Sequence, residues 1–245
     1  MFVVITMAGA GSRFEREGYT VPKYRIRARG RTLFEWSLLS LRKFAQARFI
    51  FACLEHHDPA WILDTARAIG IRDAIIAPRK HISRGQAETA LDALDGLAGD
   101  EPLWIYNIDT YLDTALSPAD MAGSDGCLHV FGSTSPAMSY VRFDEDGKVV
   151  EVAEKRVISP WASVGVYGFA RTDSFRQLYA ETYEQPITAI ESGERYVAPL
   201  FERLLARGGV VSAPRLQPDQ VHILGTPQEV LQFDSTAKPP SGAEP

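Results

Sequence analysis

Short runs of apolar residues recur through the first hundred residues and are separated by segments with a different spacing. Runs of Val, Ile and Phe bounded by glycine or polar residues are typical of strands buried on both faces of a parallel sheet. We expect four such strands, at Phe2–Met7, Arg48–Leu54, Ala74–Ala77 and Leu103–Ile108. Strand and helix therefore alternate about four times before Asp109, which predicts a parallel, doubly wound sheet.

The segments between these strands carry apolar residues at helical spacing, and their ends carry capping signals. Thr32, with Glu35 three residues later, forms the pattern of a capping box. Gly70 is placed to end a helix in a left-handed conformation. We expect helices at Leu33–Phe44, Pro59–Ile69 and Gly85–Leu97.

The second half of the chain has a different pattern of secondary structure, in which the predicted strands follow one another without long helices between them. These strands are expected at Cys127–Phe131, Met138–Phe143, Val149–Val152 and Ser163–Phe169, with short late strands at Val210–Ala213 and His222–Leu224. The sequence Asp144–Gly147 predicts a hairpin turn. Further helices are expected at Asp173–Tyr183, Tyr196–Ala206 and Pro227–Phe233, the last with Thr226 as its N-cap.

No linker, charge block or internal repeat divides the chain, so we expect one domain over residues 1–233 with an antiparallel extension. Residues 234–245 contain prolines and no aromatic residue, and we expect a disordered tail there.

Composition narrows the classes of partner. The 245 residues include 26 Lys and Arg against 31 Asp and Glu, a net charge of −5 that argues against general nucleic-acid binding. No apolar run is long enough to span a bilayer, and the N-terminus lacks the features of a signal peptide. Cys53 and Cys127 lie in apolar runs; one disulfide is possible, but we expect two buried thiols in a reducing compartment. We therefore expect a cytoplasmic protein that does not contact membranes.

The loop after the first strand is a candidate phosphate-binding site. Glycines just past the carboxyl end of a parallel strand let backbone amides approach phosphate oxygens, and two cations, Arg13 and Lys23, could neutralise a polyphosphate. A tight turn without a ligand also fits the pattern. The loop residues concerned are Ala8, Gly9, Ala10, Gly11, Ser12 and Arg13.

Two other nucleotide motifs fit this loop less well. A dinucleotide-binding loop needs a third glycine, but position 14 is Phe, and the second strand ends late, near Glu55. A Walker A loop needs Gly-Lys followed by Ser or Thr, which does not occur here. The remaining interpretation is a phosphate-binding loop of the nucleotidyltransferase type.

Asp109 directly follows the fourth strand, on the same sheet edge as the loop. A carboxylate there could hold Mg²⁺ together with phosphate oxygens, or it could cap the next turn. Gly85 and Gln86 open the third helix and could contact a base or ribose, although a plain helix start explains them nearly as well. His56 and His57 lack the further ligands of a zinc site.

Taken in order, these motifs resemble the signature of the sugar-phosphate nucleotidylyltransferases. The resemblance rests on Ala8–Arg13 with Pro22–Lys23, Gly85–Ala87, Asn107–Asp109, Glu154–Lys155, Val164–Tyr167 and Gly225–Pro227. Met7–Phe14, Tyr106–Thr110 and Glu151–Lys155 look like a capsule-locus branch that includes CTP:phosphoglutamine cytidylyltransferase. The resemblance implies a single-domain, Rossmann-like (GT-A-like) α/β fold with a mixed, mostly parallel sheet flanked by helices.

The resemblance also implies an activity and its residues. Such an enzyme transfers a nucleoside monophosphate from a triphosphate, with CTP favoured, to a phosphorylated small molecule, and it releases pyrophosphate. The product would be an activated precursor of surface polysaccharide, and Mg²⁺ would be the cofactor. The implied catalytic residues are Arg13 and Lys23, the metal ligand is Asp109, the nucleotide-binding residues are Ala8, Gly9, Ala10, Gly11, Ser12, Gly85, Gln86 and Asn107, and the acceptor-facing residues are Glu154, Lys155 and Gly165.

One position departs from the pattern of many sugar enzymes in this family. They carry an Asp two residues before the late Gly-Thr, where this chain has Ile223. Either one carboxylate holds the metal, or Asp219 or His222 substitutes. The departure weakens the case for a standard sugar 1-phosphate thymidylyl- or uridylyltransferase, which stays an alternative, and it favours a non-catalytic module that binds a nucleotide or a nucleotide sugar. A glycosyltransferase, with Asp109 and Asp113 as an acidic pair, is a minor alternative.

Overall fold

The computed structural model describes residues 1–9, 11–184 and 193–237. Its centre is strand β1 (Phe2–Thr6), which pairs in parallel with β4 (Arg48–Leu54) on one side and with β6 (Leu103–Asn107) on the other. Strand β5 (Ala74–Arg79) pairs in parallel with β4 and forms one edge of the sheet. The predicted doubly wound, parallel half is confirmed.

Side chains on β1 alternate between two hydrophobic layers, which explains its unbroken apolar run. Val3 and Ile5 belong to the layer that also holds residues of α2 (Leu33–Leu39) and α3 (Pro59–Ala68). Phe2 and Val4 belong to the opposite layer, with residues of α4 (Gln86–Ala93), α5 (Thr172–Tyr183) and α6 (Ala198–Ala206). The sheet is thus covered by helices on both faces.

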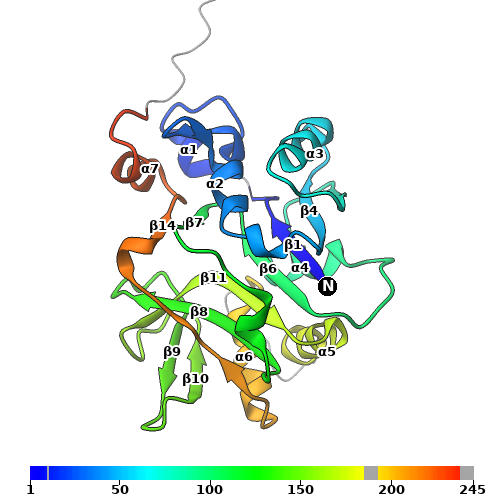
Figure 1. Ribbon diagram of the computed structural model, residues 1–245, viewed down its shortest axis with the longest axis vertical. Coiled ribbons are helices and arrows are strands. Elements are labelled where there is room, and N and C mark those ends of the chain that lie inside the picture. The colour runs from blue at the N-terminus through cyan, green and yellow to red at the C-terminus, as the bar shows by residue number, and fades with distance from the viewer. Residues whose placement is uncertain (10, 185–192, 238–245) are drawn as a thin grey trace, which may run out of the picture.

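The antiparallel extension continues the same sheet. Strand β11 (Trp161–Phe169) runs antiparallel to β6 and also pairs with β8 (Gly126–Gly132) and β9 (Tyr140–Phe143). Strand β10 (Val149–Ala153) pairs antiparallel with β9, and the short β12 (Val211–Ser212) and β13 (Arg215–Leu216) pair in parallel with β8. In Figure 1 this part lies at the opposite end of the molecule from α1, α3 and α7. The predicted antiparallel extension is confirmed.

Several element boundaries differ from the prediction. The expected loop before Pro22 contains a short helix, α1 (Ser12–Arg16), and a 3₁₀ turn follows at Lys23–Arg25. Helix α2 ends at Leu39, and the predicted continuation is the separate 3₁₀ turn Arg42–Phe44. At this break the Ser40 hydroxyl accepts a hydrogen bond from the backbone of another segment, the Leu112 N–H, at 2.9 Å.

Two small pairings were not predicted. Strands β2 (Arg27–Ala28) and β3 (Arg31–Thr32) form a hairpin whose two loop residues, Arg29 and Gly30, both have positive φ. Strand β7 (Thr110–Leu112) pairs antiparallel with β14 (Val221–Ile223), which leads into α7 (Pro227–Phe233).

Beyond α7, Asp234 and Ala237 still contact the rest of the protein. The Asp234 carboxylate accepts a hydrogen bond from the Arg29 N–H at 2.5 Å, and Ala237 is buried beside Phe233. The rest of the expected tail, residues 238–245, lies outside the described residues. Cys53 and Cys127 are buried and form no disulfide. No helix in the described ranges combines the length and apolar character needed to cross a membrane.

The predicted capping box of α2 is present and gives a test of local stability. The Thr32 hydroxyl accepts from the Glu35 N–H at 3.2 Å, and the Glu35 carboxylate accepts from the Thr32 N–H at 2.7 Å. We expect Thr32→Ala to lower the free energy of unfolding by about 1 kcal/mol, measured by urea denaturation. Thr32→Ser, which keeps the hydroxyl, should retain wild-type stability, and equal losses in both variants would contradict the capping role.

Candidate active site

A cavity of about 1180 Å³ opens at the carboxyl ends of β1, β4 and β6. In a doubly wound sheet, ligands bind in the crevice at the carboxyl ends of the strands, at the point where the strand order reverses. Strand ends and loops from distant parts of the sequence meet there. Its described lining includes Thr6, Met7, Ala8, Gly9, Gly11, Ser12, Arg13, Pro22, Lys23, Tyr24, Leu54, His56, His57, Ile82, Ser83, Arg84, Gly85, Gln86, Asn107, Asp109, Glu194 and Gly225.

The glycine-rich loop forms one wall of this cavity. Gly11 has a φ of +66° and stands at the N-cap of α1, a conformation that favours glycine. Arg13 lies on the exposed side of α1, lines the cavity, and forms no hydrogen bond or ion pair among the described residues. Ala10, the remaining predicted residue of this loop, lies outside the described residues.

Lys23 and Asp109 form an ion pair at the cavity wall. The Lys23 Nζ lies 2.6 Å from the Asp109 carboxylate and 3.4 Å from the carbonyl oxygen of Gly225. Both side chains are part-buried, at 20% and 29% exposure. Pro22 precedes the turn that holds Lys23, and the Asp109 carbonyl accepts from the Leu224 N–H at 2.7 Å, which fixes the strand leading to Gly225. Two predicted residues that are 86 positions apart in the sequence therefore meet.

Asp109 fits a magnesium site that is completed by substrate. Mg²⁺ is usually held by one or two carboxylates together with substrate phosphates and water. Within the described ranges, no cluster of three His, Cys, Asp or Glu side chains could hold a metal without substrate. His222 does not substitute for a second ligand, because its ring stacks on Tyr111 and packs against Phe233, outside the cavity lining.

Asp219 does not line the cavity among the described residues either, and its charge acts on His222. Of the two substitutes considered from the sequence, neither lines the cavity as Asp109 does among the described residues.

Gln86 and Asn107 form a second polar group at the cavity. The Gln86 Nε2 donates to the Asn107 Oδ1 at 2.6 Å and lies 3.4 Å from the Thr6 hydroxyl. Gly165 is tightly placed behind Asn107: its φ is +83°, and an added Cβ would lie 2.6 Å from the Asn107 amide nitrogen. The predicted residues Gln86, Asn107 and Gly165 are therefore brought together.

Glu154 and Lys155 are not among the described residues that line the cavity. Burial raises the pKa of Glu154, whose carboxylate accepts from the Ser139 hydroxyl at 2.5 Å. Lys155 has a φ of +50°, and its Nζ lies 3.6 Å from the carboxylate of Glu194, which does line the cavity. Lys155 is thus linked to the cavity through Glu194, a residue not identified from the sequence.

Other lining residues were also missed. His57, which is 8% exposed, packs against Tyr24 and His56 at the end of β4, with ring centroids 4.9 Å and 4.8 Å apart. Ile82 is 57% exposed at the cavity wall. The position of His56 and His57 directly after a parallel strand was the available signal, because this edge of the sheet carries the site.

A solved structure of a nucleoside-diphosphate-sugar pyrophosphorylase from Vibrio cholerae RC9 matches nearly the whole chain. The two sequences are 33% identical, the match covers 95% of this chain and 99% of the other, and the TM-score is 0.89. This chain belongs to the nucleotidyltransferase family. The resemblance found in the motifs is confirmed at that level, and the protein is an enzyme of this general kind.

More distant solved structures share the fold of this nucleotidyltransferase. The inositol-1-phosphate CTP transferase from T. maritima is 16% identical over 100% of this chain and 98% of its own, with a TM-score of 0.70. A candidate glucose-1-phosphate thymidylyltransferase from Bacillus anthracis is 14% identical over 100% and 98%, with a TM-score of 0.78. No protein-family model and no curated protein matches the chain.

The environment of His57 predicts sensitivity to acid. Burial, with the charges of His56 and Arg25, lowers the pKa of His57 from 6.5 to about 4. Because the unfolded chain then binds a proton more readily, the free energy of unfolding should fall as the pH drops from about 6.5 towards about 4. His57→Phe should flatten this part of the pH profile measured by urea denaturation.

The exposed His81 provides a control for that profile. His81→Gln should keep the wild-type slope. An unchanged slope in His57→Phe would show that other groups cause the acid sensitivity.

Proposed function

We propose that this nucleotidyltransferase transfers a nucleoside monophosphate, with CTP as the favoured donor, to a phosphorylated small molecule. Pyrophosphate is the second product, and the activated molecule serves surface-polysaccharide synthesis. The proposal rests on one observation: the glycine-rich loop, Arg13, Lys23, Asp109 and Gln86 all line a single cavity. That cavity is larger than a typical site for one drug-sized ligand, which supports a site for both a nucleotide and an acceptor.

The reaction needs little covalent help from the protein. An oxygen of the acceptor phosphate forms a bond to the α-phosphorus of the triphosphate, and the bond from that phosphorus to the bridging oxygen of pyrophosphate breaks. The acceptor phosphate is already an anion at neutral pH, so no general base is required. Positioning and neutralisation of charge remain as the tasks of the site.

The cations of the chain have distinct places in this scheme. Arg13, without a partner among the described residues, holds the leaving β- and γ-phosphates with its forked guanidinium. Lys23 faces the α-phosphate and the acceptor phosphate. Asp109 would hold Mg²⁺, which neutralises phosphate charge when bound. Glu154, Lys155 and Gly165 would contact the acceptor, and Gly85, Gln86 and Asn107 the nucleoside.

The choice of CTP is supported by the likeness of Met7–Phe14, Tyr106–Thr110 and Glu151–Lys155 to the capsule-locus branch. A thymidylyltransferase is the alternative that differs least from this proposal, because it requires the same phosphate and metal groups.

Nucleotide binding gives a test of the proposed site. Each of CTP, UTP, dTTP, ATP and GTP is added with Mg²⁺, and thermal unfolding is followed. A nucleotide at 100 times its dissociation constant should raise the midpoint by about 5 to 10 °C, because it adds roughly 2.7 kcal/mol of stability. We expect the largest shift with CTP and its loss in Asp109→Asn.

Asp113→Asn is the matched control for this experiment. Asp113 lies four residues along the chain, accepts from the Tyr111 hydroxyl at 3.1 Å, and is outside the cavity lining among the described residues. This variant should keep the wild-type shift, whereas its loss would favour the acidic pair of a glycosyltransferase. No shift with any triphosphate would overturn the proposed function.

Turnover gives a separate test, of the role of Arg13. Arg13→Ala should lower the rate of pyrophosphate release by roughly 10² to 10³, by analogy with the loss of a charge-stabilising donor in other enzymes. Arg16 lies on the same helix, outside the described cavity lining, and donates to the Ser12 carbonyl oxygen. Arg16→Ala should therefore keep the wild-type rate. Glucose 1-phosphate, inositol 1-phosphate and phosphoglutamine form the first panel of acceptors.

A second candidate function is a nucleotide-binding module without catalysis. The observation that favours it is Ile223, where many sugar enzymes of the family carry an acid. A thermal shift with one nucleotide, combined with no pyrophosphate release from any acceptor, would support that candidate instead.

A further inference from the structure

Residues 194–196 lie beside the loop that opens α4. The Arg195 N–H donates to the carbonyl oxygen of Arg84 at 2.7 Å, and the Arg195 carbonyl accepts from the Ala87 N–H at 2.9 Å. The backbone of one residue thus bridges both sides of Gly85. The segment is anchored from the other side, because the Tyr183 hydroxyl donates to the Tyr196 carbonyl at 2.6 Å.

Gly85 is required for this close approach. Its φ is +149°, and an added Cβ would lie 2.5 Å from the carbonyl oxygen of Arg195 and 2.8 Å from its nitrogen. Gly85, which we predict to contact the nucleotide, therefore also allows the backbone of Arg195 to approach the loop from the other side.

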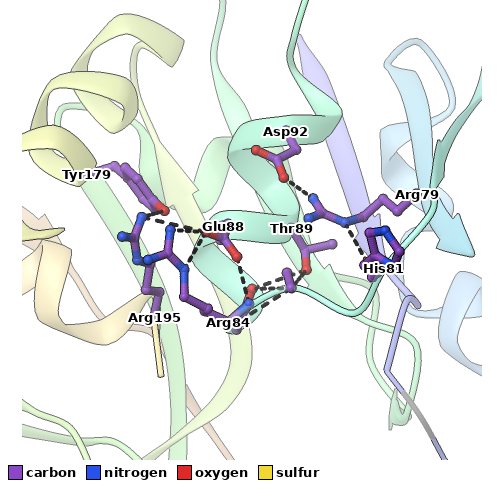
Figure 2. A network of polar contacts seen from close by, with 10 residues as sticks. Arg79, His81, Arg84, Glu88, Thr89, Asp92, Tyr179 and Arg195 are labelled. Carbon is purple, nitrogen blue, oxygen red and sulfur yellow. Dashed lines mark hydrogen bonds and ion pairs between the residues drawn. The ribbon is translucent and has the colours of Figure 1, made fainter. Parts of the chain in front are cut away.

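The Arg195 side chain continues the same contact, as Figure 2 shows. Its guanidinium donates to the Tyr179 hydroxyl, lies 3.6 Å from the Glu88 carboxylate, and stands 5.3 Å and 5.6 Å from the ring centroids of Tyr179 and Tyr183. The Arg195 and Glu88 side chains are only 15% and 13% exposed. A charge removed from water to this degree is tolerated only in a well-defined set of partners, so the arrangement is specific.

Glu88 joins Arg195 to the loop itself. Its carboxylate accepts from the Arg84 backbone N–H at 2.6 Å and from the Arg84 guanidinium at 2.6 and 2.9 Å. Burial raises the pKa of Glu88, but the hydrogen bonds from Arg84 and the charge of Arg195 outweigh it, and the pKa lies below its ordinary value. Glu88 is therefore a carboxylate shared between two arginines.

The loop held in this way carries groups of the site. Arg84, Gly85 and Gln86 line the cavity, whereas Arg195 is absent from its described lining. At the cavity wall, the Gln86 Nε2 donates to the Asn107 Oδ1 at 2.6 Å. We propose that Arg195 is a positioning residue, which sets the geometry of Gly85 and Gln86 and thereby the affinity for the nucleoside triphosphate. This inference rests on the proposed function, since it requires the nucleotide to lie against this loop.

The other end of α4 supplies a matched control. Arg176, on α5, donates to the carbonyl oxygens of Leu94 and Leu97 at 3.2 and 3.0 Å, just past the C-terminal end of α4. It holds the same helix through an arginine but lies outside the described cavity lining. Loss of Arg176 should loosen α4 without changing the loop before Gln86.

The experiment measures nucleotide binding directly, without any acceptor, so that no turnover is needed. CTP, UTP and dTTP, each with Mg²⁺, are titrated by calorimetry into wild type, Arg195→Ala, Arg195→Lys and Arg176→Ala at a temperature where all are folded. We expect Arg195→Ala to weaken binding of the preferred triphosphate by about tenfold or more, as the loss of supporting contacts does at other sites.

Arg195→Lys keeps the charge near Glu88 and the aromatic rings and should restore part of the affinity. Arg176→Ala should bind within about twofold of wild type, because distant sites act independently. The thermal midpoints without nucleotide should fall by similar amounts in Arg195→Ala and Arg176→Ala.

Two results would overturn this inference and leave the proposed function standing. They are equal losses of affinity in Arg195→Ala and Arg176→Ala, or unchanged affinity in Arg195→Ala. If the wild type binds none of the three triphosphates, the proposed function fails and the inference fails with it.

Discussion

The parallel pairing of β1 with both β4 and β6 is the constraint on which the rest of this molecule depends. It brings the ends of three strands to one edge, and the chain can leave that edge only through loops. Thr6, Leu54 and Asn107 therefore meet in one cavity although they are far apart in sequence. The apolar layers on both faces fix the strands, and the polar groups of the candidate site gather at this edge.

The parts of the fold that could be predicted were those encoded locally. Strand β4 matched its predicted bounds because a compact apolar run ended at Glu55, and the start of α2 followed from Thr32 and Glu35. The β2–β3 hairpin was missed because its first loop residue is Arg29, which has a φ of +47° where Asn, Asp or Gly is usual. Strand β7 was missed because its partner β14 lies over 100 residues away and both are short.

The same distinction, between local sequence signals and contacts that the fold creates, applies to the residues of the candidate site. The glycine loop, Lys23 and Asp109 carry recognisable residue types in a fixed order, and the structure brings them to one wall. Arg195 has no such signal, because its partners come from α4 and α5 and its role depends on a backbone contact. Its sequence neighbour Glu194 was missed for the same reason. The fold determines these contacts, so spacing alone could not identify them.

Pro78 has a consequence for how this sheet meets other chains. The carbonyl oxygens of Asp73 and Arg79 accept from N–H groups at the two ends of β4, so alternate residues of edge strand β5 bond inward. Pro78 belongs to the outward-facing set, and it has no N–H to offer. A strand from a second molecule would lose a hydrogen bond on approaching this edge, so the sheet is protected there against growth by edge-to-edge aggregation.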